Sequence, residues 1–183
     1  YLTRNYRESY GMYALNGILF NHESPRRGEN FVTRKITLSL ARILSGKQQC
    51  LYLGNMEANR DWGYAKEFVE GMWRMLQQPV AEDYVLATGR VASVRDFLEV
   101  CLVRAGISFE RKGTGKDETY IDTRSSKTIV AIDPYYYRPA EVDYLCGDAS
   151  KAKKMLGWEA KTDLQGLASL MMEADCKAEG VTI

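Results

Sequence analysis

Residues 12–28 read MYALNGILF followed by NHESPRRG, an apolar run that ends in a polar turn with two arginines. The apolar run, residues 12–20, is β-prone and predicts a central buried strand. Ligands collect at the carboxyl ends of strands in α/β sheets, so we expect residues 21–27 to face a cleft. Guanidinium groups bind phosphate in a bidentate manner, which suits such a site. A solvated turn, in which Pro25 simply ends the strand, explains the same local pattern equally well.

Outward from this stretch, segments with strand-like and helical spacing alternate, which predicts an α/β architecture with a largely parallel sheet. The strand candidates are residues 50–53, 84–87 and 128–132. The helix candidates are residues 32–44, 68–76, 94–105, 149–156 and 163–178. The part from Gly89 onward has weaker strands and shorter helices and is interpreted as a smaller α/β lobe.

Helix starts and one loop are predicted from local chemistry. Ser93 with Asp96, and Thr162 with Gln165, have the spacing of capping boxes. Asp148 is expected to cap the short helix that ends at Gly157. The segment 113–127 is polar and contains glycine, which predicts a mobile loop; its Gly-x-Gly does not complete a dinucleotide-binding or P-loop pattern.

Composition and charge exclude several classes of protein. The 183 residues carry 25 Lys and Arg against 24 Asp and Glu, so the net charge of +1 gives no argument for nucleic acid or a membrane surface. No apolar run approaches the ~18 residues that a membrane span needs. The only histidine is His22, and the four cysteines lie far apart in the sequence, so no metal site is expected. Scattered cysteines of this kind are typical of reduced thiols in a cytoplasmic protein.

Two further loops carry an arginine beside an expected element end. Residues 60–63 read RDWG before a helix candidate; either Asp61 caps that helix with Trp62 in the core, or Arg60 faces an anion. Residues 135–141 place three tyrosines, an arginine and a glutamate around a proline, which suits a nucleotide base with its phosphates and equally suits a packed interface. Together with residues 21–28, these loops favour a phosphorylated ligand.

Longer motifs carry a resemblance to a known family. Residues 5–10 read NYRESY, residues 16–28 read NGILFNHESPRRG and residues 31–36 read FVTRKI. Shorter matches follow in order at Leu53-Gly54-Asn55, Arg60-Asp61-Trp62-Gly63, Ala87-Thr88-Gly89, Tyr137-Arg138-Pro139-Ala140-Glu141-Val142, Gly147-Asp148 and Leu156-Gly157-Trp158. Over nearly its whole length the chain resembles the GDP-mannose 4,6-dehydratases, which are extended short-chain dehydrogenase/reductases. The stretches NHESPRRG and FVTRK are specific to that family, whereas Arg-Asp-Trp is shared more widely.

The resemblance implies a fold and a reaction. The fold would be the C-terminal part of an extended Rossmann-type parallel sheet plus a smaller α/β substrate-binding lobe. Residues 1–88 would complete the NADP-binding domain and include segments of the substrate lobe, and residues 89–183 would mainly bind the GDP-sugar. The reaction converts GDP-mannose to GDP-4-dehydro-6-deoxymannose on the route to GDP-fucose and related deoxyhexoses. Sugar C4 is oxidised transiently, water leaves across C5 and C6, and the hydride returns to C6.

The resemblance also implies roles for individual residues. The positions matching cofactor contacts are His22 and Arg27. Those matching sugar-nucleotide contacts are Asn21, Val32, Lys35, Arg60, Arg138 and Glu141, with the cations facing the diphosphate and Glu141 the ribose. The family's Gly-rich loop, catalytic Thr and Glu, and Tyr-x-x-x-Lys pair all precede the match to Tyr1. The segment is therefore expected to hold no catalytic residue and to be inactive alone, and self-association as a homodimer or homotetramer is implied.

Two alternatives stay open. A GDP-sugar reductase or epimerase of the same superfamily would keep the fold and change the reaction, although residues 21–28 disfavour it. A non-catalytic GDP-sugar-binding fragment fits the absence of the proton-transfer residues from this segment. The mass of the isolated protein would separate these possibilities, because a second or longer polypeptide favours the enzyme over the fragment.

Overall fold

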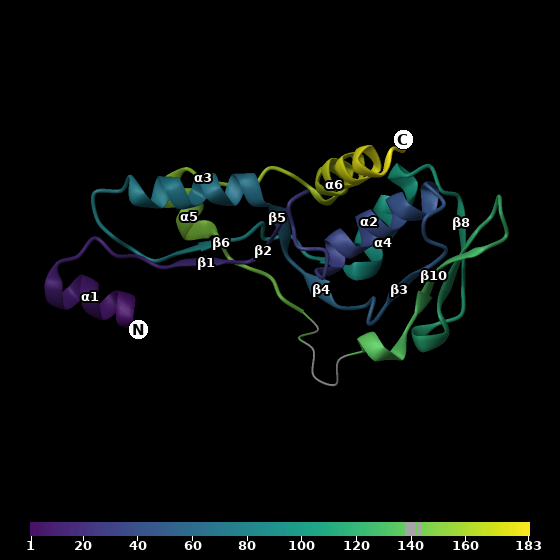
Figure 1. Ribbon diagram of the computed structural model, residues 1–183. Coiled ribbons are helices and arrows are strands. Elements are labelled where there is room, and N and C mark those ends of the chain that lie inside the picture. The colour runs from purple at the N-terminus through teal and green to yellow at the C-terminus, as the bar shows by residue number, and fades with distance from the viewer. Residues whose placement is uncertain (138–141, 143) are drawn as a thin grey trace. The chain divides into compact units, whose positions relative to one another are not determined.

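The computed structural model describes residues 1–137, 142 and 144–183, which divide into two compact units (Figure 1). Each unit is assembled from three separate stretches of chain. The first unit contains Tyr1–Glu23, Asp61–Val91 and Leu145–Asp163, and the second contains Ser24–Arg60, Ala92–Tyr144 and Leu164–Ile183. The assignment of residues 1–88 to the cofactor and of residues 89–183 to the sugar nucleotide is a functional division, and it stays a prediction.

The first unit is built from parallel strand pairs covered by helices. Its elements are α1 (Leu2–Tyr10), β1 (Gly17–Leu19), β2 (Asn21–Glu23), β5 (Trp62–Tyr64), α3 (Ala65–Leu76), β6 (Tyr84–Leu86) and α5 (Ser150–Leu156). β1 pairs with β6 and β2 with β5, both in parallel. Figure 1 shows α3 and α5 alongside β6. Phe68, Tyr84, Leu86 and Trp158 dominate the core, and the Trp158 indole donates to the Glu67 carbonyl at 2.8 Å.

The prediction of a central buried strand over residues 12–20 is wrong. β1 covers only Gly17–Leu19, and Met12 and Ile18 are 52% and 54% exposed. A parallel strand is buried when it has neighbours on both edges and layers on both faces. Among the described residues β6 is the one strand paired with β1, so the apolar composition of this run is not matched by burial here.

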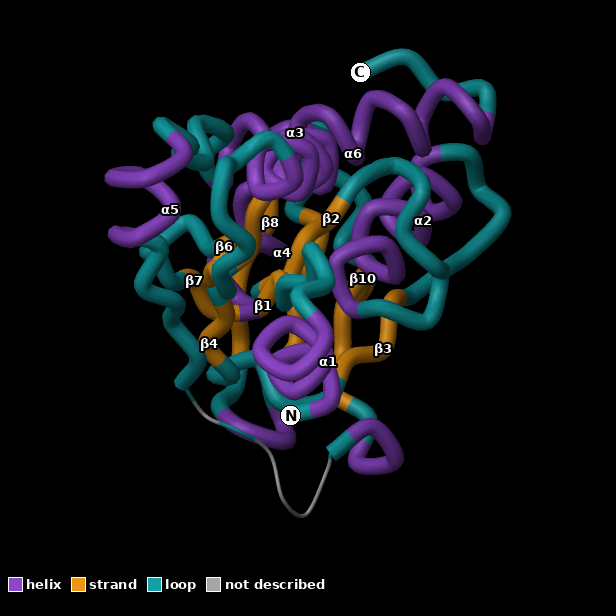
Figure 2. The backbone as a smooth tube through the Cα atoms, turned by 90° about the vertical axis from the view of Figure 1, so that its left-hand side faces the viewer, coloured by secondary structure: helices purple, strands orange, loops and turns teal. Residues whose placement is uncertain are grey.

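The second unit combines a mixed sheet with three packed helices. The sheet has the order β3-β10-β9-β8, with β3 and β10 parallel and the other pairs antiparallel; Figure 2 shows β3 beside β10. Its strands are β3 (Leu51–Leu53), β8 (Phe109–Lys112), β9 (Thr119–Asp122) and β10 (Thr128–Ile132), and a separate antiparallel pair joins β4 (Asn59–Arg60) to β7 (Ala92–Ser93). The helices are α2 (Val32–Leu44), α4 (Val94–Arg104) and α6 (Leu164–Glu179), with short 3-10 turns η1 (Gly115–Asp117) and η2 (Pro134–Tyr136).

The helices of the second unit enclose an apolar core at period-3.6 positions. Ile36, Leu40, Phe97, Leu102 and Met171 are fully buried. The predicted helices over 32–44 and 94–105 are therefore confirmed. No helix in the described part of the chain is long and apolar enough to cross a membrane.

The predicted helix starts and the predicted loop have mixed outcomes. Ser93 and Asp96 do form a capping box on α4. The Thr162 hydroxyl instead donates to Glu67 at 3.0 Å, and α6 begins two residues later. Asp148 accepts from the Ser150 amide at 2.9 Å, but the N-cap of α5 is Ala149. The expected loop over 113–127 contains the 3-10 turn η1 and the strand β9. The sequence pattern did not indicate β9, because a strand with one face in water has a polar composition like that of a loop.

Candidate functional site

Asn21 and His22 lie in β2, at the first unit's parallel pair. The register places Asn21 opposite Trp62 and His22 opposite Gly63 of β5. The His22 ring stacks on Phe68 with centroids 5.2 Å apart, and its Nδ1 lies 2.8 Å from the Phe20 carbonyl oxygen. A carbonyl only accepts, so we infer that Nδ1 carries the proton, and Nε2 of the neutral ring is then an acceptor.

Asp61 contacts both the turn that follows β6 and a second turn at Gly147. Its carboxylate is fully buried. Oδ1 accepts from the Thr88 amide at 2.8 Å and hydroxyl at 2.7 Å, and Oδ2 accepts from the amides of Gly89 and Gly147 at 2.9 and 3.2 Å. The alternative that Asp61 caps the next helix is wrong, because the N-cap of α3 is Tyr64. Asp61 instead joins two turns that are distant in sequence.

A cavity of about 200 Å³ adjoins these turns in the first unit. It is lined by Ala87, Thr88, Gly89, Gly147, Asp148, Ala149, Ser150, Lys153, Trp158, Glu159 and Ala160. The ammonium of Lys153 is paired with Glu159 at 2.8 Å. The lining thus combines charged and polar side chains with Trp158, which is its largest apolar side chain.

In the second unit, the turn that carries Arg27 is held by α2. Arg34 Nη1 donates to the carbonyl oxygen of Pro25 and lies 3.4 Å from that of Arg27. The Arg27 guanidinium stacks over the Phe31 ring, with its carbon 3.6 Å from the ring centroid. Stacking leaves the edge of a guanidinium available for hydrogen bonds in its own plane. The fold thus fixes both the backbone and the plane of Arg27.

Val32 and Lys35 lie in the first turn of α2. Val32 is the first helical residue and is half-buried. The Lys35 ammonium lies 3.4 Å from the centroid of the Tyr136 ring in η2. Burial lowers the pKa of Lys35, while the nearby Asp133 carboxylate opposes that shift. A partly desolvated ammonium over an aromatic ring interacts strongly with an anion.

Arg60 ends β4, on a segment that α4 holds in place. Its Nη1 donates to the Asn59 carbonyl at 2.8 Å and also to the carbonyl of Val142. Directly before β4, the carbonyls of Met56 and Ala58 accept from the first two amides of α4, each at 3.1 Å. These amides have no partner inside their own helix, so the segment leading to Arg60 also completes the N-terminus of α4.

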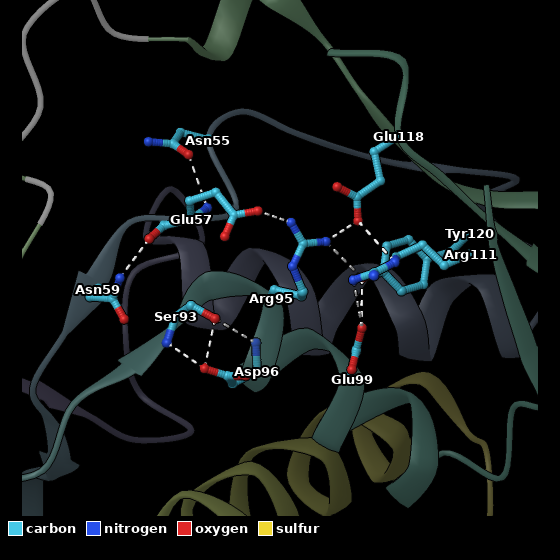
Figure 3. A network of polar contacts seen from close by, with 10 residues as sticks. All are labelled: Asn55, Glu57, Asn59, Ser93, Arg95, Asp96, Glu99, Arg111, Glu118 and Tyr120. Carbon is cyan, nitrogen blue, oxygen red and sulfur yellow. Dashed lines mark hydrogen bonds and ion pairs between the residues drawn. The ribbon is translucent and has the colours of Figure 1, made fainter. Parts of the chain in front are cut away.

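An arginine network supports the same segment (Figure 3). The Arg95 guanidinium lies between Glu57 and the buried Glu118 and pairs with both. It also lies 3.4 Å from the Tyr120 hydroxyl, which donates to Glu99 at 2.9 Å. Burial raises the pKa of Tyr120 above its usual range, with the nearby Glu99 acting in the same direction. The network ties the segment before Arg60 to the β8–β9 hairpin.

The structure assembles part of the predicted residue set. Arg27, Val32, Lys35 and Arg60 belong to the second unit, and Arg34 joins the Arg27 turn to the helix bearing Val32 and Lys35. Asn21 and His22 belong to the first unit. Arg138 and Glu141 lie outside the described residues.

Sequence reasoning missed three supporting residues, namely Arg34, Asp61 and Arg95. Each lies in a stretch singled out from the sequence, Arg34 in FVTRKI, Asp61 in RDWG and Arg95 between the capping-box residues 93 and 96, but none of these patterns indicated a supporting role. Within the described residues, no three His, Cys, Asp or Glu side chains are grouped as for a metal ion. All four cysteines are free thiols.

The sequence comparisons match one family. The family model described as GDP-mannose 4,6 dehydratase matches residues 1–171. A protein named GDP-mannose 4,6-dehydratase from Sinorhizobium fredii is 55% identical over 175 residues, covering 96% of this chain and 50% of that protein. One named GDP-mannose 4,6 dehydratase from Homo sapiens is 48% identical over 175 residues, covering 96% and 47%. The chain spans about half the length of the curated relatives it matches.

Solved structures with low sequence identity show the same fold. The structure of RMD from Pseudomonas aeruginosa complexed with NADPH aligns with a TM-score of 0.78 at 18% identity, covering 97% of this chain and 52% of that one. The structure of dTDP-glucose 4,6-dehydratase from Bacillus anthracis in complex with NAD aligns with a TM-score of 0.74 at 15% identity, covering 98% and 50%. The predicted α/β, Rossmann-type architecture is therefore confirmed.

Proposed function

This chain belongs to the GDP-mannose 4,6-dehydratase family, and we propose on that premise that it forms part of an NADP-dependent hydro-lyase. That enzyme converts GDP-mannose to GDP-4-dehydro-6-deoxymannose, which feeds the formation of GDP-fucose and other deoxyhexoses. The observation that carries the proposal is the family match over residues 1–171, which includes the whole two-arginine turn and the start of α2. The geometry supports it, because cationic and aromatic side chains occur together on this turn and helix.

His22 and Arg27 are proposed as cofactor contacts, and their chemistry fits NADP. When bound, NADP supplies the transient oxidation at sugar C4 and the return of that hydride at C6. The Nε2 acceptor of His22 suits a hydroxyl or carboxamide donor better than a phosphate. The guanidinium of Arg27 suits a phosphate, and its stacking on Phe31 reduces the freedom it would lose on binding.

The remaining predicted contacts are proposed for the sugar nucleotide. Lys35, Arg60 and Arg138 would neutralise the diphosphate, and Glu141 would accept from the ribose hydroxyls. Asn21 would bind the sugar nucleotide, and Val32 would pack against it. Because Lys35 is partly desolvated, a bound diphosphate would restore the stability of its charged form.

The proposed activity of the chain alone, its domain division, its location and its oligomeric state rest on the resemblance to the family. No catalytic residue is assigned to this segment, so the 183 residues alone would not turn over GDP-mannose. Residues 1–88 would serve mainly the cofactor domain and residues 89–183 mainly the sugar-nucleotide lobe. The protein would act in the cytoplasm as a homodimer or homotetramer.

The test compares the chain alone with the chain joined to the N-terminal half of a relative. GDP-mannose and NADP are incubated with the 183-residue chain, with the N-terminal half of the Sinorhizobium relative, and with the two joined in one polypeptide. We expect no product from either half and, from the joined protein, a nucleotide sugar that has lost one water. A GDP-hexose of unchanged mass would indicate an epimerase, and turnover by the chain alone would show that the catalytic residues are misplaced. A joined protein that folds and binds GDP-mannose without turnover would favour the binding fragment.

A further inference from the structure

A buried carboxylate on the C-terminal helix is coupled to the turn that carries Arg27. Asp175, on α6, is 1% exposed. Its Oδ2 accepts from the Thr37 hydroxyl at 2.6 Å, and its Oδ1 lies 2.7 Å from Nη2 of Arg34. The other terminal nitrogen of Arg34 contacts the carbonyls of the Arg27 turn described above. One guanidinium thus joins a fixed anion to a loop backbone.

This arrangement is poorly explained as helix packing alone. A buried ion pair must overcome the desolvation of both charges, and well-packed apolar residues serve packing at least as well. Elsewhere α6 packs on α2, with Met171 fully buried. Glu179 of α6 pairs with Arg42 of α2 at 3.2 Å and with Lys47, just after α2, at 2.7 Å. The particular consequence of the Asp175 charge is to fix the direction of Arg34.

We propose that Asp175 is a positioning residue for the Arg27 turn, acting through Arg34. With Asp175 in place, Arg34 is held with one nitrogen toward the carboxylate and the other toward the carbonyls of residues 25 and 27. The turn then holds the Arg27 guanidinium over Phe31. The identity of the ligand that meets Arg27 rests on the proposed function, whereas the positioning itself does not. Asp175 also lies beyond residue 171, where the family match ends.

The first experiment measures the order of the turn by limited trypsin digestion of the full 183-residue chain. Cleavage after Arg26 and Arg27 reports opening of the turn. Cleavage after Arg124, in an exposed turn of the same unit, is the internal reference. In Asp175→Asn, which keeps an acceptor for Thr37 and removes the charge, we expect cleavage of the Arg27 turn to rise about tenfold relative to cleavage after Arg124. Arg34→Lys should have the same effect, because one ammonium cannot reproduce both sets of contacts.

The matched control is Glu179→Gln, which removes a charge from the same helix but leaves the Arg34 contacts intact. It should leave the cleavage ratio unchanged. An unchanged ratio in both Asp175→Asn and Arg34→Lys overturns the proposal. An equal rise at all three arginines also overturns it, since that would assign Asp175 to general folding.

The second experiment tests the ligand separately. NADP is titrated into the joined protein described above, and Asp175→Asn is expected to weaken binding about tenfold, with Glu179→Gln unchanged. If the cleavage ratio changes and the NADP affinity does not, positioning stands and the cofactor role of Arg27 is removed. If the unsubstituted joined protein does not bind NADP, the proposed function fails while the cleavage result is unaffected.

Discussion

The two units of the molecule use a buried aspartate in different ways. Asp61, in the first unit, accepts four hydrogen bonds from neutral amide and hydroxyl donors. Asp175, in the second unit, faces one hydroxyl and one guanidinium. The neutral donors around Asp61 belong to two backbone turns, so Asp61 holds those turns together. The Arg34 side chain beside Asp175 is long enough to contact a second group as well, here the carbonyls of the Arg27 turn. Burial alone therefore does not reveal what a carboxylate does.

The units also differ in how completely they enclose apolar surface. In the second unit, residues such as Ile36 and Phe97 are fully buried between helices. In the first unit, α3 leaves Val69, Trp73 and Leu76 60%, 61% and 58% exposed. Since apolar burial is the main favourable term in folding, the second unit is expected to be the more stable of the two.

Removal of the Asp61 carboxylate should cause the greatest loss of unfolding free energy among these substitutions. Asp61→Ala removes the shared acceptor of these four donors. Because a hydrogen bond to a charged group contributes about 1.5–3 kcal/mol, the loss should cost about 3–5 kcal/mol of unfolding free energy. Hydrogen exchange should then lose protection in β6 and in residues 145–149 while α4 keeps its protection. Asp148→Ala is the control, because that carboxylate accepts from Ser150 near the surface. Equal loss of protection in both units would show that Asp61 does not act on the first unit alone.

A smaller effect is expected from a close backbone approach in the second unit. A Cβ at Gly54 would lie 2.3 Å from the carbonyl oxygen of Tyr136, so Gly54→Ala must displace η2. We expect a cost of about 1–3 kcal/mol, as for other overpacked sites, and a displaced Tyr136 ring beneath Lys35. Urea unfolding measures the cost, and the Lys35 ammonium shift in NMR spectra measures the displacement.

The control for this substitution is Gly28→Ala, where the new methyl would meet only the Phe31 ring, at 3.4 Å. It should change the unfolding free energy little. If the Gly54→Ala protein is as stable as the control, η2 moves aside without an energetic cost. The second unit would then exceed the first in apolar burial but not in rigidity at this site.

Helices with one continuous apolar face were predictable from the sequence, whereas solvent-exposed strands were not. The stripe through Ile36 and Leu40 and the box at Ser93 encode α2 and the start of α4 by local spacing. β8 has mainly exposed side chains, so it lacks the burial pattern that would separate it from a loop. The apolar composition of residues 12–20 predicted burial that the structure does not show. The burial of a strand depends on its neighbouring strands and not on its own composition.

The candidate site was predictable at the level of residue types. The arginines of the 21–28 turn and Lys35 were predicted from motifs, but the residues that hold this turn, Arg34 and Asp175, were not. Asp175 lies about 140 positions after Arg34 in the sequence, and no local pattern joins two residues so far apart. Only the packing of α6 on α2 brings them together.

The α4 cap offers a moderate test within the second unit. Ser93→Ala removes the acceptor for the Asp96 amide and the hydroxyl that donates to the Asp96 carboxylate. A lost N-cap of this kind should cost about 1 kcal/mol, measured by urea unfolding. Ser93→Asn, which can accept the same amide, should recover most of the loss. If the cost falls instead on the first unit, seen by exchange in β6, the two units do not unfold separately.

The smallest effect concerns an ion pair at the surface of the first unit. Arg7 donates to Asp83 at 2.8 Å, as does the Asn16 amide, and these hydrogen bonds hold the pKa of Asp83 well below its usual range. A carboxyl whose pKa is lower in the folded state contributes stability above its unfolded pKa of about 4, and that contribution is lost as the pH falls. The Asp83 side chain is 35% exposed, so solvent screening makes the contribution smaller than that of the Ser93 cap. A carbon-13 NMR titration should place the Asp83 midpoint below 3.8, and Arg7→Gln should return it toward that value. A midpoint near 4 in the unsubstituted chain would show that α1 is not anchored through this pair, leaving the first unit even less tightly held than the second.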